Sequence, residues 1–255
     1  MALRLSVCVE MIFRELPFLE RLDRVAAAGY PAFEFWRIAD KDVDAIRAKQ
    51  RDLGLACAAF VGTAGLSLVD PSRRAELLPA LEEALGVARK LECRTLIATT
   101  GQALPDVPRE AQHASVVAAL KELARPCEDR GVYLVLEPLN VLVDHKGYYL
   151  DRSAEAFQIL DEVGSPAVKC LYDAYHQQVT EGNLIATMTA NVAKIGHVHV
   201  ADVPGRHEPG TGEVSYRNVF KALDAAGYAG YVGLEYRPLA DAATALAATK
   251  ALVTG

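Results

Sequence analysis

The chain has 255 residues, with 51% hydrophobic residues, 24% charged residues and a formal net charge of −6. This apolar fraction excludes intrinsic disorder, and a pI near 5.6 argues against a nucleic-acid partner, which would require a basic face. No apolar run reaches the roughly 20 residues that a membrane helix needs, and the N-terminus lacks the apolar core of a signal peptide. We therefore expect a cytoplasmic protein with no membrane contact.

Short apolar runs alternate with longer amphipathic stretches along the chain. The expected strands cover residues 3–9, 33–36, 55–61, 95–99, 132–136, 168–172, 195–201 and 231–234. The expected helices cover residues 17–28, 41–53, 71–91, 108–130, 153–163, 183–192, 216–226 and 240–252. Asp70 followed by Pro71 marks the start of the third helix, because Asp is favoured at the N-cap and Pro at the first helical position.

These runs make eight strand-then-helix units, which almost fill the 255 residues. Near-continuously apolar strands that alternate with helices predict a parallel sheet covered by helices. The number of units and the length favour an α/β fold of the (β/α)8 TIM-barrel type, as a single domain over residues 1–255. The glycine fingerprints of nucleotide-binding folds do not occur in the chain.

The cysteines predict no catalytic nucleophile and no disulfide framework. Their odd number and wide spacing are typical of reduced thiols, which pack as small buried hydrophobes. They are Cys8, Cys57, Cys93, Cys127 and Cys170.

Polar side chains follow or end four consecutive strands of the second half: Glu137, Asp173, His199 and Glu235. Any one of these carboxylates alone would be interpreted as a helix cap or loop anchor. In a barrel, however, the carboxyl ends of the strands meet at one mouth, where three carboxylates would repel each other strongly. A divalent cation relieves that repulsion, and three oxygen ligands with one imidazole suit Mn²⁺ or Mg²⁺, with Co²⁺ or Zn²⁺ as alternatives.

The segment from Glu137 to Pro238 carries four longer motifs. They are LEPLN (136–140), YDAYHQQVTEGNL (172–184), KIGHVHVADVPGRHEPGTGEVSY (194–216) and GLEYRP (233–238). With these motifs the chain resembles the hydroxypyruvate isomerase family, within the xylose-isomerase-like TIM-barrel superfamily. Relatives include the 2-oxo-tetronate isomerases and the ketose 3-epimerases of the tagatose and psicose type.

The resemblance implies one divalent metal ion held by Glu137, Asp173, His199 and Glu235, with Glu137 and Glu235 also acting as the catalytic acid/base pair. The reaction would remove a proton next to a carbonyl and pass through an enediolate that the metal stabilises. Return of the proton to the neighbouring carbon gives isomerisation, and return to the opposite face gives epimerisation. The substrate would be a small sugar or hydroxy-oxo acid, and a homo-oligomer, either a dimer or a tetramer, is expected.

Two departures favour the ketose 3-epimerases as the alternative. His199 stands where many hydroxypyruvate isomerases carry Gln, and the segment 60–69 is shorter than in some of them. A DNA-cleaving barrel of the endonuclease IV type conflicts with the balance of 27 basic to 33 acidic residues. A non-catalytic sugar-binding barrel would not need two glutamates facing one site.

Several other residues are candidates near the mouth. His176, three residues after Asp173, could hydrogen-bond a substrate oxygen or could instead orient a metal ligand. The resemblance implies that Arg206 also binds substrate, although on the sequence alone Arg206 is a solvated loop residue. His197, two residues before His199, is expected to pack in the core or support the ligand. Asn140 could bond near the metal or serve as a turn residue. The FEFW segment (33–36) places an aromatic side chain either under the substrate or in rim packing.

Overall fold

The computed structural model describes residues 3–254 and contains nine parallel strands within them. The strands are β1 (Arg4–Cys8), β2 (Ala32–Glu34), β3 (Ala56–Cys57), β4 (Phe60–Val61), β5 (Thr95–Thr99), β6 (Tyr133–Glu137), β7 (Val168–Asp173), β8 (Ile195–Val200) and β9 (Tyr231–Leu234). The α-helices are α1 (Phe18–Ala27), α2 (Val43–Leu53), α3 (Arg74–Leu91), α4 (Arg109–Arg130), α5 (Ser153–Val163), α6 (Ala174–Thr180), α7 (Leu184–Ala190), α8 (Tyr216–Ala225) and α9 (Ala242–Thr254).

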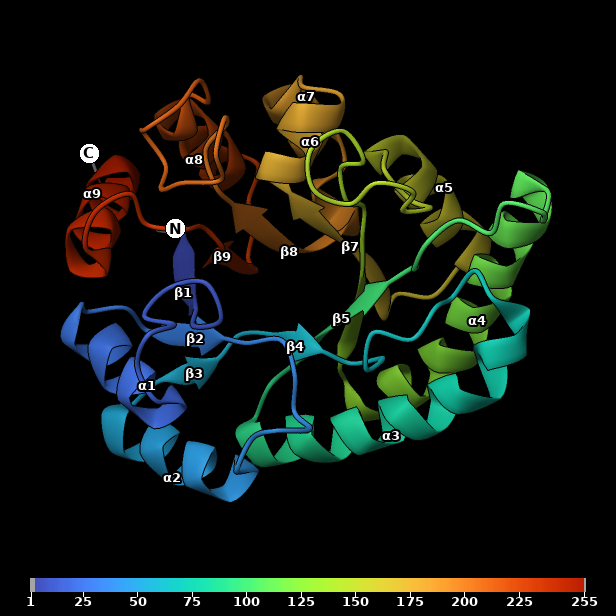
Figure 1. Cartoon of the computed structure of the whole chain (residues 1–255), viewed down its shortest axis with the longest axis horizontal. Coiled ribbons are helices and arrows are strands. Elements are labelled where there is room, and N and C mark those ends of the chain that lie inside the picture. Colours follow the sequence, from blue (N-terminus) through green and yellow to red (C-terminus); the bar gives the residue numbers. More distant parts are fainter. Residues whose placement is uncertain (1–2, 255) are drawn as a thin grey trace.

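The strands curl into the expected TIM barrel. Hydrogen-bonded neighbours run in the order β3-β2-β1-β9-β8-β7-β6-β5-β4, so the two end strands are also consecutive in the chain. A backbone bond joins the two ends of the sheet, since the Val61 N–H of β4 donates to the carbonyl of Trp36, just after β2, at 3.0 Å. The helices surround this sheet in chain order (Figure 1).

The third predicted strand, 55–61, needs correction because the structure divides it into β3 and β4. Its first part pairs with β2 and its second part with β5, and Ala58 and Ala59 join them. The run still bonds both neighbours, since the Phe35 N–H donates to Ala59 O at 3.3 Å and the Gly62 N–H donates to Ile97 O at 2.8 Å. Only the regular register is interrupted, at Ala58 and Ala59.

The segment after β7 also differs from the prediction, because α6 begins directly at the end of the strand. The Asp173 carboxylate caps this helix by accepting hydrogen bonds from the Tyr175 N–H and the His176 N–H. The third helix begins as predicted, with the Asp70 side chain accepting from the Ser72 N–H. A short 3-10 turn over 71–73 then leads into α3.

The alternation of side chains along the strands places the polar site above an apolar floor. Val135 lies two residues before Glu137, and Leu171 lies two residues before Asp173, so each pair shares one face of the sheet. The floor is a small buried cluster separate from the main core, made of Ala59, Ile97, Val135 and Leu171. The barrel interior is therefore closed on the floor side, and chemistry is confined to the other end.

Two further predictions concern the cysteines and membrane-spanning helices. All five cysteines are free and buried, as predicted. No helix within residues 3–254 is both long enough and apolar enough to cross a bilayer.

Candidate metal and proton-transfer site

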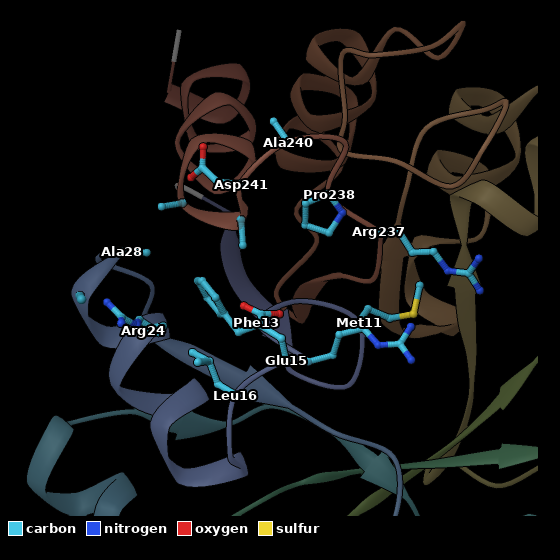
Figure 2. A pocket seen from close by; sticks show the side chains of 14 residues that line it. Met11, Phe13, Glu15, Leu16, Arg24, Ala28, Arg237, Pro238, Ala240 and Asp241 are labelled. Carbon is cyan, nitrogen blue, oxygen red and sulfur yellow. The ribbon is translucent and has the colours of Figure 1, made fainter.

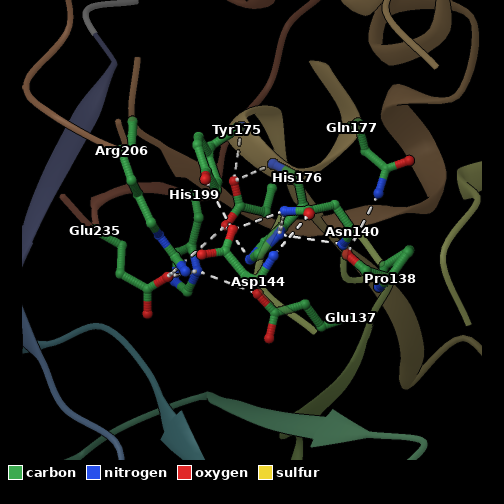
Figure 3. Close-up of polar contacts among 12 residues, drawn as sticks. Glu137, Pro138, Asn140, Asp144, Tyr175, His176, Gln177, His199, Arg206 and Glu235 are labelled. Carbon is green, nitrogen blue, oxygen red and sulfur yellow. Dashed lines mark hydrogen bonds and ion pairs between the residues drawn. The ribbon is translucent and has the colours of Figure 1, made fainter. Parts of the chain in front are cut away.

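The four predicted ligand residues meet at the carboxyl ends of β6 to β9. Figure 3 labels three of them, Glu137, His199 and Glu235. One ligand atom from each of them lies within 4.8 Å of those of the others, and all four side chains are buried. They are Glu137, Asp173, His199 and Glu235. Asp173 and His199 are direct neighbours in the register of β7 and β8, which explains their proximity. The structure thus brings together the complete predicted set.

The electrostatics of the site reflect the crowding of negative charge. Burial raises the pKa of Glu137 and of Asp173 above their ordinary values, and the charge of Glu235 adds to this effect. Burial also acts on Glu235, but the charges of His199 and Arg206 and a hydrogen bond from Trp36 outweigh it and lower its pKa. Glu137 and Glu235 therefore lie in environments that shift their pKa values in opposite directions.

The donor set fits a divalent cation. Nδ1 of His199 is buried without a hydrogen-bond partner, and it lies 3.5 Å from Glu137 Oε1 and 3.5 Å from Glu235 Oε2. A buried nitrogen without a partner is costly unless another group binds it. A cation between this nitrogen and the carboxylates would satisfy the nitrogen and offset the repulsion of the acids.

His176 lies beside the ligand set with a defined tautomer. The backbone N–H of Asn140 donates to His176 Nδ1 at 3.2 Å, so this nitrogen is an acceptor and the proton resides on Nε2. Burial and the charge of Arg206 lower the pKa of His176 well below its usual value, which keeps the ring neutral. Its Nε2 is buried and has no hydrogen-bond partner, so it is available as a donor.

Arg206 reaches the site from the loop that follows β8. Its backbone adopts φ 59°, a left-handed conformation that is uncommon for a non-glycine residue. The guanidinium bonds the Glu235 carboxylate and lies 3.7 Å from Asp173 Oδ2, while its Cζ lies 5.0 Å from the centre of the Tyr175 ring. Its Nε is buried with no partner. Arg206 is therefore not a solvated loop residue.

A cavity of about 580 Å³ opens over these residues. Glu137, His176, Arg206 and Glu235 line one side. The other side comes from the loop after β2, from the segment after β4 and from α3, with the lining residues Trp36–Ala39, Gly62, Ala64, Gly65, Ala80, Glu83 and Ala84. The cavity is therefore acidic and polar on one side and mostly apolar on the other.

Two supporting residues, Asp144 and Asp202, were not predicted from the sequence. Asp144 accepts hydrogen bonds from Asn140 Nδ2 and from the hydroxyl of Tyr175, at 2.9 and 2.8 Å. Asp202 accepts from three backbone N–H groups of the loop that carries Arg206, those of Val203, Gly210 and Val214. The turn-forming sequence after β8 is the one local signal that points to Asp202.

Other candidates find defined places. Trp36 donates its Nε1–H to Glu235 Oε1 at 2.9 Å, so it lies against the site as well as at the rim. Asn140 bonds His176 and therefore lies beside the ligand candidates. His197 is fully buried and bonds the carboxylate of Glu34, as expected for a supporting residue.

A second cavity, of about 660 Å³, lies between the loop after β1 and the start of α9 (Figure 2). Phe13, Arg24, Pro238 and Asp241 are among its lining residues. It contains none of the four clustered ligand residues, so we place the chemistry in the first cavity.

Comparisons with known proteins extend these observations. The family model described as "Xylose isomerase-like TIM barrel" matches residues 22–252. The chain is 32% identical to hydroxypyruvate isomerase of Escherichia coli (strain K12), over 92% of this chain and 94% of that protein. It is also 32% identical to 2-oxo-tetronate isomerase of Cupriavidus necator, over 95% of this chain and 96% of that protein.

Solved structures agree on the fold. An "AP endonuclease, family 2" from Brucella melitensis superposes with a TM-score of 0.92 at 30% identity, covering 98% of this chain and 99% of that one. An L-ribulose 3-epimerase superposes with a TM-score of 0.81 at 22% identity, covering 98% of this chain and 93% of that one, a likeness of fold alone. From the barrel, the clustered site and the family model together, the chain belongs to the xylose isomerase-like TIM barrel family.

Proposed function

We propose that this protein is a metal-dependent isomerase of a small hydroxy-oxo acid, of the hydroxypyruvate or 2-oxo-tetronate isomerase kind. The observation that carries the proposal is the buried group of three carboxylates and one imidazole, which the chain gathers from four consecutive strand ends. Relatives that match more than nine tenths of the chain bear the names of such isomerases. Mn²⁺ or Mg²⁺ suits the donor set best, with Co²⁺ or Zn²⁺ as alternatives.

Glu137 and Glu235 are the proposed proton-transfer pair. Each carboxylate has an oxygen 3.5 Å from His199 Nδ1, so both approach the same point. One removes the proton from the carbon next to the carbonyl, and a carboxyl group returns it to the neighbouring carbon. A divalent cation held by the four ligands would stabilise the negative charge that develops on the substrate oxygens.

The carboxylate of Glu235 is firmly held. Both oxygens of Glu235 accept hydrogen bonds, one from Trp36 and the other from Arg206. We therefore assign Glu235 as the group with the fixed orientation.

His176 and Arg206 are the proposed substrate-binding residues. The neutral His176 ring offers its Nε2–H to a substrate oxygen, because the Asn140 N–H occupies the other nitrogen. Arg206 offers its unpartnered Nε–H and a positive charge. Arg37 lines the same cavity, so two guanidinium groups are available to a substrate carboxylate.

A ketose 3-epimerase is the alternative function. The same proton-transfer pair would serve it, and a cavity of about 580 Å³ has room for a longer sugar chain. Cleavage of DNA is disfavoured in spite of the structural likeness to the "AP endonuclease, family 2" protein, because the net charge of −6 does not suit a phosphate backbone.

Product analysis in D₂O tests the proposal and separates the two functions. The purified protein is supplied with Mn²⁺ and with hydroxypyruvate, 2-oxo-tetronates, ribulose, tagatose or psicose. We expect isomerised product from an oxo acid, with deuterium at the carbon that receives the proton. Conversion of the ketoses alone would establish the epimerase, and conversion of no substrate would contradict both functions.

Two variants test the roles of the residues. Glu235→Gln should abolish deuterium exchange into the substrate while leaving the fold intact. Glu208→Gln is the matched control, because Glu208 is also buried but accepts a hydrogen bond from the Leu239 N–H and is not a ligand candidate. Exchange retained in Glu235→Gln at the parent rate would refute the assignment.

A further inference from the structure

A second buried acidic group lies directly behind the ligand set, on the opposite side of the His199 ring. Glu34, at the end of β2, is 2% exposed and does not line the cavity. Its Oε1 lies 2.9 Å from His199 Nε2, whereas Nδ1 of the same ring faces Glu137 and Glu235. The imidazole is therefore placed between the carboxylate of Glu34 and the proposed metal position.

The other oxygen of Glu34 is fixed by two donors. Ser6 Oγ donates to Glu34 Oε2 at 2.7 Å, and His197 Nε2 lies 2.9 Å from the same oxygen. Ser6 comes from β1 and His197 from β8, so the carboxylate is held by strands on both sides of β9. A carboxylate bonded in this way has little freedom to rotate away from His199.

The strand between these two donors, β9, has a glycine at the level of the Glu34 carboxylate. Gly233 of β9 is paired with Ser6 on one side and His199 on the other. A Cβ atom at Gly233 would lie 2.4 Å from Glu34 Oε1 and 2.6 Å from Oε2, closer than real Cβ contacts occur. The absence of a side chain at Gly233 therefore leaves the space that the Glu34 carboxylate occupies.

We propose that Glu34 is a positioning residue for the metal site: its carboxylate faces His199 Nε2 at 2.9 Å, which favours a proton on Nε2 and so leaves the Nδ1 lone pair for the cation. Acceptors of this kind fix the tautomer and orientation of metal-binding histidines. The inference rests on the proposed function, since it presupposes that His199 binds a metal ion.

The same three residues, Glu34, His197 and His199, could be interpreted as a second metal site, since their ligand atoms also lie close together. Glu34 Oε2, however, is already engaged by Ser6 and His197. One carboxylate oxygen and one ring nitrogen would remain, which is fewer than the three or four protein ligands of usual transition-metal sites. The positioning role accounts for every contact of the carboxylate.

Calorimetric titration with Mn²⁺ tests the proposal on the parent protein, Glu34→Gln and the control Glu208→Gln. We expect one ion per chain in the parent, about 10- to 100-fold weaker binding in Glu34→Gln, and binding within about twofold of the parent in Glu208→Gln. Titration with Co²⁺ should show a changed visible absorption spectrum in Glu34→Gln, because the ring orientation differs. Activity of Glu34→Gln should recover at saturating Mn²⁺, which a general loss of structure would not allow.

Unchanged Mn²⁺ affinity together with an unchanged Co²⁺ spectrum in Glu34→Gln would overturn the proposal, and so would two ions per chain in the parent. If the parent binds no metal, the proposed function fails and the inference fails with it. If Glu34→Gln does not fold, Ser6→Ala removes one donor from the carboxylate instead. A few-fold weaker Mn²⁺ affinity in Ser6→Ala supports the role of Glu34, and an unchanged affinity contradicts it.

Discussion

The two halves of the barrel meet at one cavity but contribute to it differently. Strands β6 to β9 supply all four clustered ligand residues. The first half supplies mainly small and apolar wall residues, among them Gly62, Ala64, Ala80 and Ala84. Two of its polar groups, Glu34 and Trp36, contact the ligand candidates from behind or from the side, while Arg37 and Glu83 line the opposite wall.

The clustered ligand candidates and the residues that hold them in place therefore come from different halves of the chain. The second half would determine which cation the site can hold, because all four clustered ligand candidates lie there. The first half determines how firmly two of those groups are held, because Glu34 contacts His199 and Trp36 donates to Glu235. The following predictions test this division.

The largest difference is expected between two glutamates that line opposite sides of the cavity, Glu137 and Glu83. Glu137→Gln should lower kcat by about 10²- to 10⁴-fold, since it removes a proton-transfer group. Glu83→Gln changes a glutamate of α3 on the opposite wall and should leave kcat unchanged. Steady-state kinetics with Mn²⁺ measures both, and an equal loss in the two variants would contradict the division.

Metal binding should stabilise the parent protein measurably. At a Mn²⁺ concentration of about 100 times the Kd, the free energy of unfolding should rise by about 2.7 kcal/mol. Asp173→Ala removes a ligand and should lose this increment, whereas Trp36→Phe removes only a donor to Glu235 and should keep most of it. Chemical denaturation with and without Mn²⁺ provides the measurement. An increment that survives in Asp173→Ala would exclude this residue as a ligand.

A more moderate effect is expected at Gly233. The added methyl group of Gly233→Ala would meet the Glu34 carboxylate, so the variant should be destabilised by about 1–3 kcal/mol and should bind Mn²⁺ more weakly. Denaturation and calorimetry report the two effects. Gly227→Ala offers a comparison at a position with open space around it, although its φ of 77° adds strain of its own. Unchanged metal affinity in Gly233→Ala would separate the packing of Glu34 from metal binding.

The smallest effect is expected on the outer surface of the first half. Lys90 on α3 pairs with Asp44 on α2 at 2.8 Å, and both side chains are exposed. Because exposed ion pairs contribute little to stability, Lys90→Met should shift Tm by less than about 2 °C and leave kcat unchanged. A marked loss of activity would show that the outer helices of this half influence the site.

The sequence allowed prediction of the barrel and of the four clustered residues for one physical reason. Each ligand candidate directly follows or ends an apolar strand, and parallel strands of a barrel bring such ends together. His197 was also predictable as a supporting residue, because side chains two residues apart in a strand share a face. Local patterns along the chain carry this information.

Contacts across the barrel could not be predicted in the same way. Glu34 and His197 are 163 residues apart, and Trp36 and Glu235 are 199 residues apart. The apolar pattern does not indicate which residues of different strands lie at the same level of the barrel. Helix α6 was missed because Asp173, identified as a ligand candidate, is also its N-cap. The division of strand 55–61 depends on pairing with two neighbours, which a uniformly apolar run does not reveal.

The division between β3 and β4 has a consequence for motion. Each of these strands has only two register pairs with its neighbour, whereas β5 and β6 share five. We expect backbone amides of residues 56–61 to exchange with solvent faster than those of β6, because fewer hydrogen bonds must open there. Val61, Gly62 and Ala64, which follow this junction, line the apolar side of the cavity. We therefore expect this wall to be the more mobile side of the cavity and the strand ends that carry the acidic residues to be the more rigid side.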